Sequence, residues 1–239
     1  MEKPTSPDFR RCAVAREGCV LQSMLVIGLG RFGLNLAQKL AELGNEVMCV
    51  DRDEAPVNRI APLVTSAQIG DCTDEEVLDE LGVDQYDVCF VCMSDDFQSS
   101  LEITSLLKEH GARRVVSKAD RDIHAKFLLK VGADFVVNPE RDMAQRTAVR
   151  YSARNVFDYI ELADDYAIFE METPEAWAGR TALELNIRAR YNVNIIGTRS
   201  QGRVVPYTDA TRPFERGAHL VMAGSKRDIL RLSNTRKQG

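Results

Sequence analysis

The sequence contains no run of about 20 consecutive apolar residues, the length that a membrane-spanning helix needs. A role at a membrane would therefore require a partner protein. Basic residues are not in excess either, because 31 Lys and Arg stand against 36 Asp and Glu, a formal net charge of -5. Binding to phosphates of nucleic acids needs a basic surface, so we expect no nucleic-acid partner. Residues 1–22 lack the apolar core of a signal peptide and are predicted to form a flexible N-terminal tail.

Cysteine is present but lacks the placement of a disulfide framework. Cys49, Cys89 and Cys92 lie in apolar runs that are typical of buried strands. Cys89 and Cys92 match a CxxC pattern, but residues three apart on a strand point to opposite faces, which disfavours a shared metal or a disulfide. Free buried thiols fit a cytoplasmic protein.

The residues of a catalytic set are also missing. None of the six tyrosines is followed four positions later by lysine, as a short-chain dehydrogenase requires. The three histidines, His110, His124 and His219, are scattered and have no clear carboxylate or cysteine partner in the sequence. We therefore expect a ligand-binding protein and no enzyme.

Strand-like and helix-like segments alternate from residue 23 to residue 140. This rhythm predicts an α/β fold with a Rossmann-type doubly wound parallel sheet, which forms a nucleotide-binding domain over 23–140. We expect a helix that serves as crossover and dimerisation element, with a linker, over 141–163, followed by a small α+β domain over 164–235. Within that domain, Thr181–Ala189 is predicted to be helical.

A glycine-rich loop follows the first predicted strand and opens the first predicted helix. It consists of Gly28, Leu29, Gly30, Arg31, Phe32 and Gly33, and an acidic residue, Asp51, ends the next predicted strand. The spacing GxGxxG in this context is typical of a dinucleotide site, in which the pyrophosphate binds the helix N-terminus and the acid binds ribose hydroxyls. The alternative is that the glycines serve only a turn.

Arg31 bears on the identity of the nucleotide. A cation at a helix N-terminus opposes the helix dipole, so its presence favours a ligand with more negative charge than a dinucleotide, such as ATP or ADP. The alternatives are that Arg31 points to solvent, and that the protein is an NAD-dependent oxidoreductase using NAD/NADH.

Longer motifs extend the argument. They are Val26–Gly33, Gly70–Thr73, Lys118–Ala119, Gly132–Met143 and, near the C-terminus, Leu185–Tyr191. Together they resemble the RCK (KTN) cytosolic gating subunits of Trk/Ktr-type bacterial potassium uptake systems, with the GLGRFG variant most like the Ktr branch. The resemblance implies dimers assembled into an octameric ring on the cytoplasmic side of a membrane potassium channel or transporter subunit. ATP would favour the conducting state and ADP would compete with it.

The resemblance also implies roles for individual residues. Arg31 would contact the terminal phosphate, and Asp51 would hold the ribose. Arg52 with the Asp71–Cys72 turn would flank the adenine, and Ser94 and Lys118 would lie near the mouth of the cleft. Glu140 would help to bind Mg²⁺ or a monovalent cation between protomers; the alternative is an acidic residue favoured by a helix N-terminus.

In relatives of this kind the C-terminal module often binds cyclic di-AMP at a dimer interface. The matching residues are Ile187, Arg188, Asn194, Ile196 and Pro206. The alternative is that these residues only pack a small sheet. A sensor of the same fold that serves an antiporter is a further alternative, since the chain carries no trace of its membrane partner.

Overall fold

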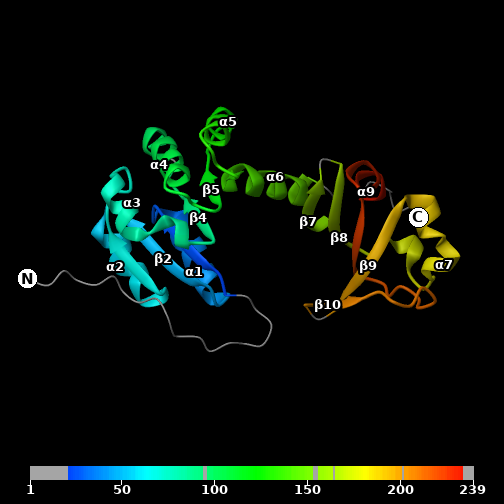
Figure 1. Ribbon diagram of the computed structural model, residues 1–239. Helices are drawn as coiled ribbons and strands as arrows, with labels where there is room; N and C mark the ends of the chain where they lie inside the picture. Colours follow the sequence, from blue (N-terminus) through cyan, green and yellow to red (C-terminus); the bar gives the residue numbers. More distant parts are fainter. Residues whose placement is uncertain (1–20, 94–95, 153–155, 164, 201, 234–239) are drawn as a thin grey trace, which may run out of the picture. The chain divides into compact units, whose positions relative to one another are not determined.

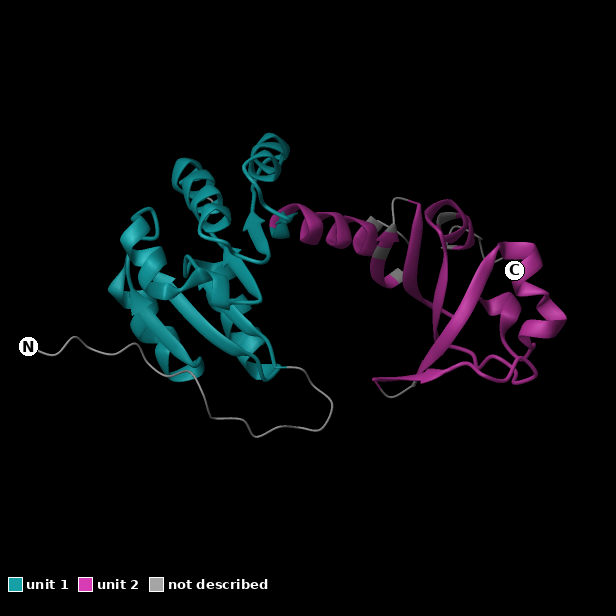
Figure 2. Cartoon of the chain, viewed as in Figure 1, with its two compact units in different colours: residues 1–139 teal, residues 140–239 magenta. Residues whose placement is uncertain are grey.

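The computed structural model describes residues 21–93, 96–152, 156–163, 165–200 and 202–233. The chain divides into two compact units, residues 1–139 and residues 140–239 (Figure 2). None of the helices in the described part combines the length and the apolar character needed to cross a membrane.

The first unit is built on a parallel sheet of six strands in the order β3-β2-β1-β4-β5-β6 (Figure 1). The strands are β1 (Ser23–Ile27), β2 (Glu46–Asp51), β3 (Ser66–Ile69), β4 (Val88–Val91), β5 (Val115–Lys118) and β6 (Phe135–Val137). The helices are α1 (Arg31–Glu42), α2 (Glu54–Ile60), α3 (Glu75–Leu81), α4 (Phe97–Glu109) and α5 (Asp122–Lys130), with short turns η1 (Ala61–Leu63) and η2 (Val83–Gln85). This order confirms the predicted Rossmann-type fold.

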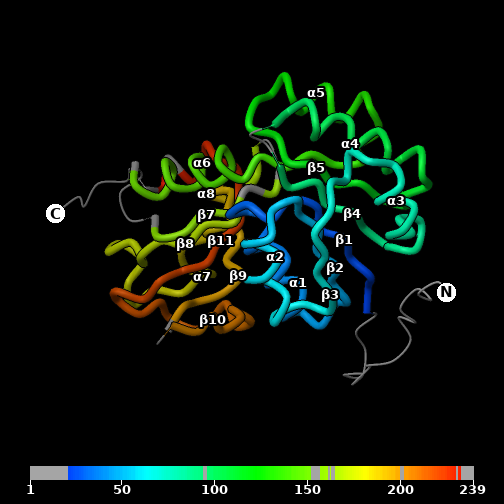
Figure 3. The backbone as a smooth tube through the Cα atoms, turned by 90° about the vertical axis from the view of Figure 1, so that its left-hand side faces the viewer, coloured from blue at the N-terminus to red at the C-terminus, as the bar shows by residue number. Residues whose placement is uncertain are grey.

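Alternating side chains of the strands build a core on each face of this sheet. Leu25 and Ile27 of β1 pack on the face that also holds residues of α3 and α4. Met24 and Val26 pack on the opposite face, against α1 and α2. Figure 3 shows α1 and α2 on one side of β1 and β2 and α3 and α4 on the other. Helices on both faces explain why the strands are apolar nearly throughout.

The two cysteines of the CxxC pattern confirm this alternation. Cys89 belongs to the core beneath α3 and α4, whereas Cys92 belongs to the core beneath α1 and α2. Both thiols are free, and burial raises the pKa of each to about 12. The pair therefore packs as small apolar side chains on opposite faces of the sheet.

The second unit contains an antiparallel sheet of five strands in the order β10-β9-β11-β8-β7. Its strands are β7 (Val156–Ala163), β8 (Tyr166–Glu172), β9 (Val193–Ser200), β10 (Arg203–Pro206) and β11 (His219–Ser225). Its helices are α6 (Pro139–Ser152), α7 (Ala182–Leu185), α8 (Ile187–Tyr191) and α9 (Lys226–Ser233), with a short turn η3 (Glu175–Trp177). Trp177, Phe169 and Leu220 lie at the centre of its core.

Two local expectations in this unit differ from the structure. Residues 156–163, expected to lie in a linker, form strand β7, which pairs antiparallel with β8 and places Tyr159 in the core. The helix expected over Thr181–Ala189 is split into α7 and α8, because Asn186 between them adopts a left-handed conformation with φ 48°. Asparagine tolerates this conformation better than most residues, and it interrupts the helical hydrogen bonds.

Candidate functional site

The glycine loop joins β1 to α1 at the carboxyl end of the parallel sheet. Gly28 has a φ of +90°, which favours glycine, and its N–H donates to Val50 O at 2.9 Å. A Cβ atom on Gly33 would lie 1.9 Å from Gly28 O, so only glycine lets α1 pack this closely on the loop. A Cβ atom on Gly30 would meet nothing within 4 Å. Protein packing therefore requires Gly28 and Gly33, while Gly30 faces open space.

The N-terminus of α1 has the electrostatic character of an anion site. Gly30 is its N-cap and provides no side-chain cap, and the first turn holds no acidic residue. The first N–H groups of a helix lack partners within the helix, and they carry roughly half a positive charge. Arg31, the first residue of α1, is exposed and forms no ion pair with any described residue. The loop thus presents uncapped N–H groups and a free guanidinium beside open space.

Asp51 ends β2 and lies against the loop. Its Oδ2 accepts a hydrogen bond from Leu29 N at 2.5 Å, and its Oδ1 accepts one from Asp53 N at 2.9 Å. Parallel pairing of Ile27 with Val50 brings the ends of β1 and β2 together, which explains this contact. The structure therefore places the predicted ribose-binding carboxylate beside the glycine loop.

A second group of charges lies where β3 and β4 end. Asp71 Oδ1 accepts hydrogen bonds from Thr73 N at 3.0 Å and Thr73 Oγ1 at 2.8 Å. These bonds lower the pKa of Asp71; the positive charge of Arg52 adds to the effect and the negative charge of Asp96 opposes it. Hydrogen bonds from Ser99 lower the pKa of Asp96, to which Arg52 also contributes. Arg52, Asp71 and Asp96 thus lie close enough for their charges to interact.

Asp96 was not among the predicted site residues, although the sequence held a signal for it. Asp96 is the N-cap of α4, and its carboxylate accepts from Ser99 N at 3.1 Å and Ser99 Oγ at 2.6 Å. An aspartate before an amphipathic helix is a common N-cap. Ser94, which was predicted near the cleft mouth, lies outside the described residues.

The remaining predicted residues of the first unit are placed as follows. Cys72 is buried, and burial raises the pKa of its thiol to about 12, so the group stays protonated and acts as packing. Lys118 ends β5 and is 9% exposed, and its Nζ lies 3.3 Å from Asp120 Oδ1. Glu140, the second residue of α6, is exposed. No group of three or more potential metal ligands occurs within the described ranges of this single chain.

The residues expected to bind cyclic di-AMP fall into two environments. Ile187 is 4% exposed and packs in the core of the second unit, so its side chain supports α8. Arg188, Asn194 and Pro206 are exposed, and Ile196 is 43% exposed. Pro206 on β10 pairs with Gly197 on β9, which brings it close to Ile196.

The expectation that the histidines lack carboxylate partners is wrong for two of them. His110 Nδ1 lies 2.8 Å from Asp79 Oδ1, and His219 Nδ1 lies 2.8 Å from Glu170 Oε1. These partners are 31 and 49 positions away in the chain, beyond the reach of local sequence patterns. His110 is the C-cap of α4. It therefore lies near the amino ends of the parallel strands, whereas the glycine loop lies at their carboxyl ends.

Two family models match most of the chain. The TrkA-N domain model matches residues 24–139, and the TrkA-C domain model matches residues 166–236. The chain is 42% identical over 206 residues to the Ktr system potassium uptake protein C of Bacillus subtilis (strain 168), covering 86% of this chain and 93% of that protein. It is 35% identical over 209 residues to the Ktr system potassium uptake protein A of the same strain, covering 87% and 94% respectively.

A solved structure described as the GsuK channel bound to NAD shares the fold. It superposes with a TM-score of 0.64 at 20% identity and covers 87% of this chain. This chain spans 38% of that longer chain. At this identity the likeness shows the fold alone.

Proposed function

Because the chain belongs to the Ktr-like branch of the TrkA family of potassium uptake proteins, we propose that it is a nucleotide-sensing regulatory subunit of a membrane potassium channel or transporter. ATP favours the conducting state and ADP the non-conducting state. The subunit is cytoplasmic, lies at the inner face of the membrane through its partner, and assembles from dimers into an octameric ring. It has no enzymatic activity of its own.

The observation that carries this proposal is that Arg31 forms no ion pair with any residue the structure describes and lies at a helix N-terminus without a side-chain cap. The helix N–H groups attract phosphates of any nucleotide, so they do not discriminate between ATP and ADP. The guanidinium of Arg31 supplies a full positive charge and bidentate donors. A γ-phosphate interacts with this group more strongly than a β-phosphate does. Asp51 binds the ribose hydroxyls and repels the additional phosphate of NADP.

Gating follows from differential binding. A ligand shifts an equilibrium between two conformations only by the difference in its affinity for them. In our proposal the γ-phosphate, Arg31 and a cation held near Glu140 come together only when protomers approach. α6 then transmits the change to the antiparallel sheet of the second unit. Arg188, Asn194, Ile196 and Pro206, with Ile187 supporting them from the core, form a second effector site for cyclic di-AMP.

The test compares Arg31→Ala with Arg52→Ala by isothermal titration with ATP and ADP. Both arginines are exposed, but Arg52 is assigned to the adenine side, which the two nucleotides share. We expect Arg31→Ala to reduce the ATP/ADP affinity ratio and Arg52→Ala to weaken both nucleotides equally. An unchanged ratio in Arg31→Ala would overturn the assignment.

The second candidate is an NAD-dependent oxidoreductase, which the position of Asp51 also suits. Melting curves with ATP, ADP and NADH separate the two, because a ligand at a hundred times its dissociation constant stabilises the fold by about 2.7 kcal/mol. A shift with NADH alone would favour the oxidoreductase.

A further inference from the structure

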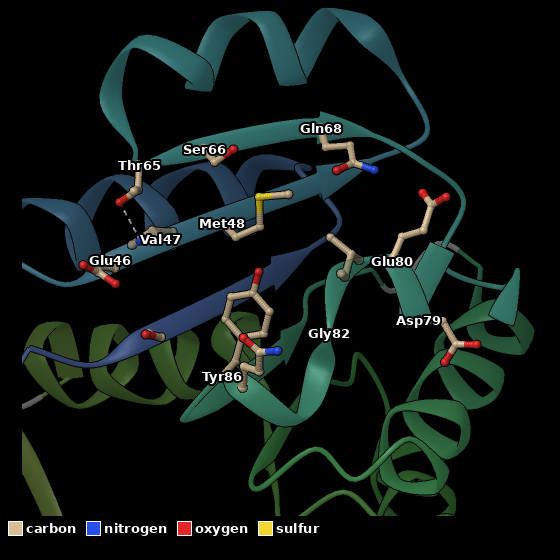
Figure 4. Close-up of a pocket in the computed structure, with 13 residues that line it drawn as sticks. Glu46, Val47, Met48, Thr65, Ser66, Gln68, Asp79, Glu80, Gly82 and Tyr86 are labelled. Atoms are coloured by element: carbon tan, nitrogen blue, oxygen red, sulfur yellow. Dashed lines mark hydrogen bonds between the residues drawn. The ribbon is translucent and has the colours of Figure 1, made fainter. Parts of the chain in front are cut away.

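A cavity of about 400 Å³ opens on the face of the first sheet that carries α3 and α4 (Figure 4). Its walls come from the first residues of β1 and β2, from β3, and from the end of α3 with η2. α3 has only seven residues and ends at Leu81; its C-cap Gly82 has a φ of +63° and lines the cavity together with residues of β2 and β3. The glycine loop lies at the opposite ends of β1 and β2, so the cavity is separate from the nucleotide site.

Tyr86 is a largely buried residue that contributes a hydroxyl group to this cavity. Its side chain belongs to the core, the residue is 8% exposed, and its hydroxyl points toward Met48 (Figure 4). No described residue forms a hydrogen bond with this hydroxyl, and it is not among the fully buried polar atoms that lack a partner, so the oxygen atom itself is accessible from the cavity. The hydroxyl is therefore available to a molecule that enters the cavity.

The charge of the lining has one sign. Asp79, Glu80 and Glu46 contribute three carboxylates, and the lining contains no Lys, Arg or His. Asp79 is engaged by His110, while Glu46 and Glu80 form no ion pair with any residue that the structure describes. Met48 and Leu81 add apolar surface beside these acids.

We propose that this cavity binds a small organic cation of the aliphatic polyamine class. Its volume falls in the range of about 300–1,000 Å³ that is common for small-molecule sites. Ammonium groups pair with the carboxylates of Glu46 and Glu80, and one donates a hydrogen bond to the Tyr86 hydroxyl. The methylene chain covers Met48 and Leu81, and the Tyr86 ring adds a cation–π attraction. The site does not depend on the proposed nucleotide function.

Isothermal titration of the full chain with spermidine tests this site. We expect a saturable heat with one molecule bound per chain. Tyr86→Phe keeps the ring but removes the acceptor, and it is expected to weaken binding about tenfold, as loss of a hydrogen bond to a charged group does. Glu46→Gln and Glu80→Gln are each expected to weaken it about twofold to fivefold, since their carboxylates are partly or fully solvated.

Glu76→Gln is the matched control, because Glu76 is an exposed glutamate of α3 that does not line the cavity. It makes the same change in net charge and should leave spermidine affinity unaltered. Tyr86→Phe without spermidine should melt as the unsubstituted chain does, since it loses no hydrogen bond. The absence of saturable heat, or equal weakening by Glu76→Gln and Glu80→Gln, would overturn the site. ATP and ADP affinities in the same samples should not change.

Discussion

The carboxylate of Asp51 accepts a hydrogen bond from the backbone N–H of Leu29 at 2.5 Å, across the gap between β2 and the glycine loop. This bond directly joins the two parts of the proposed nucleotide site. A ribose at Asp51 and a phosphate at the loop would therefore be held by elements that already support each other.

Replacing Asp51 should cost stability as well as binding. Asp51→Ala removes the acceptor for Leu29 N and Asp53 N and is expected to lower the free energy of unfolding by about 1–3 kcal/mol. Asp53→Ala is the control, because the Asp53 side chain makes no capping bond to α2. Denaturant unfolding measures both variants. Equal losses in the two variants would contradict this role of Asp51.

Two glycines of the loop should respond to the same substitution to very different extents. Gly33→Ala forces a Cβ atom against Gly28 O and should destabilise the first unit by about 1–3 kcal/mol or more. Gly30→Ala meets open space at a φ of -63° and should cost less than about 1 kcal/mol. Thermal unfolding and nucleotide titration distinguish them. If Gly30→Ala left both stability and nucleotide affinity unchanged, no phosphate would approach that backbone closely.

The carboxyl of Asp71 should titrate below its ordinary value of 3.8. A depressed pKa in the folded state stabilises the fold above the unfolded pKa, and this contribution is lost as the pH falls through the folded pKa. Thr73→Val removes one donor and should move the pKa of Asp71 upward. Thr211→Val is the counterpart, because Thr211 donates to Asp209 in the second unit and lowers its pKa similarly. In an NMR titration, each variant should shift only its own aspartate.

The ion pair between Arg146 and Asp158 should connect α6 to β7 with modest energy. The guanidinium contacts Asp158 Oδ1 at 2.7 Å and Oδ2 at 3.0 Å, and both side chains are partly exposed. A double-mutant cycle with Arg146→Ala and Asp158→Ala should give a coupling of about 0.2–1 kcal/mol. A coupling near zero would mean that α6 and β7 are held by packing alone.

Cyclic di-AMP should bind the full chain through the second unit. Arg188→Ala removes an exposed cation from the proposed site and should weaken binding, since phosphates prefer arginine. Arg190→Ala removes a neighbouring exposed arginine of the same helix outside that set and should have a smaller effect. Isothermal titration gives both affinities. No heat at high ligand concentration would end the proposal for this unit.

Local spacing was enough to predict the parallel sheet and the juxtaposition of the glycine loop with Asp51. Both depend on short segments in which each strand end is marked by a glycine or an acid. The strand β7 was missed, because it follows α6 and mixes acidic with apolar residues. The partners of His110 and His219 were missed because tertiary packing brings them together. The cavity at Tyr86 depends on where α3 stops, which the sequence places only to within a few residues.

The four described cysteines offer a way to time the opening of the first unit. Cys49, Cys72, Cys89 and Cys92 are all buried, and burial raises the pKa of each to about 12. A thiol-specific alkylating reagent should therefore label them only when the fold opens, since the thiolate is the reactive species. Because Cys89 and Cys92 belong to opposite faces of the sheet, their labelling rates report separately on the two helical layers. A nucleotide that holds the loop against β2 should slow the labelling of Cys72, which follows the adenine-side Asp71, more than it slows the labelling of Cys89.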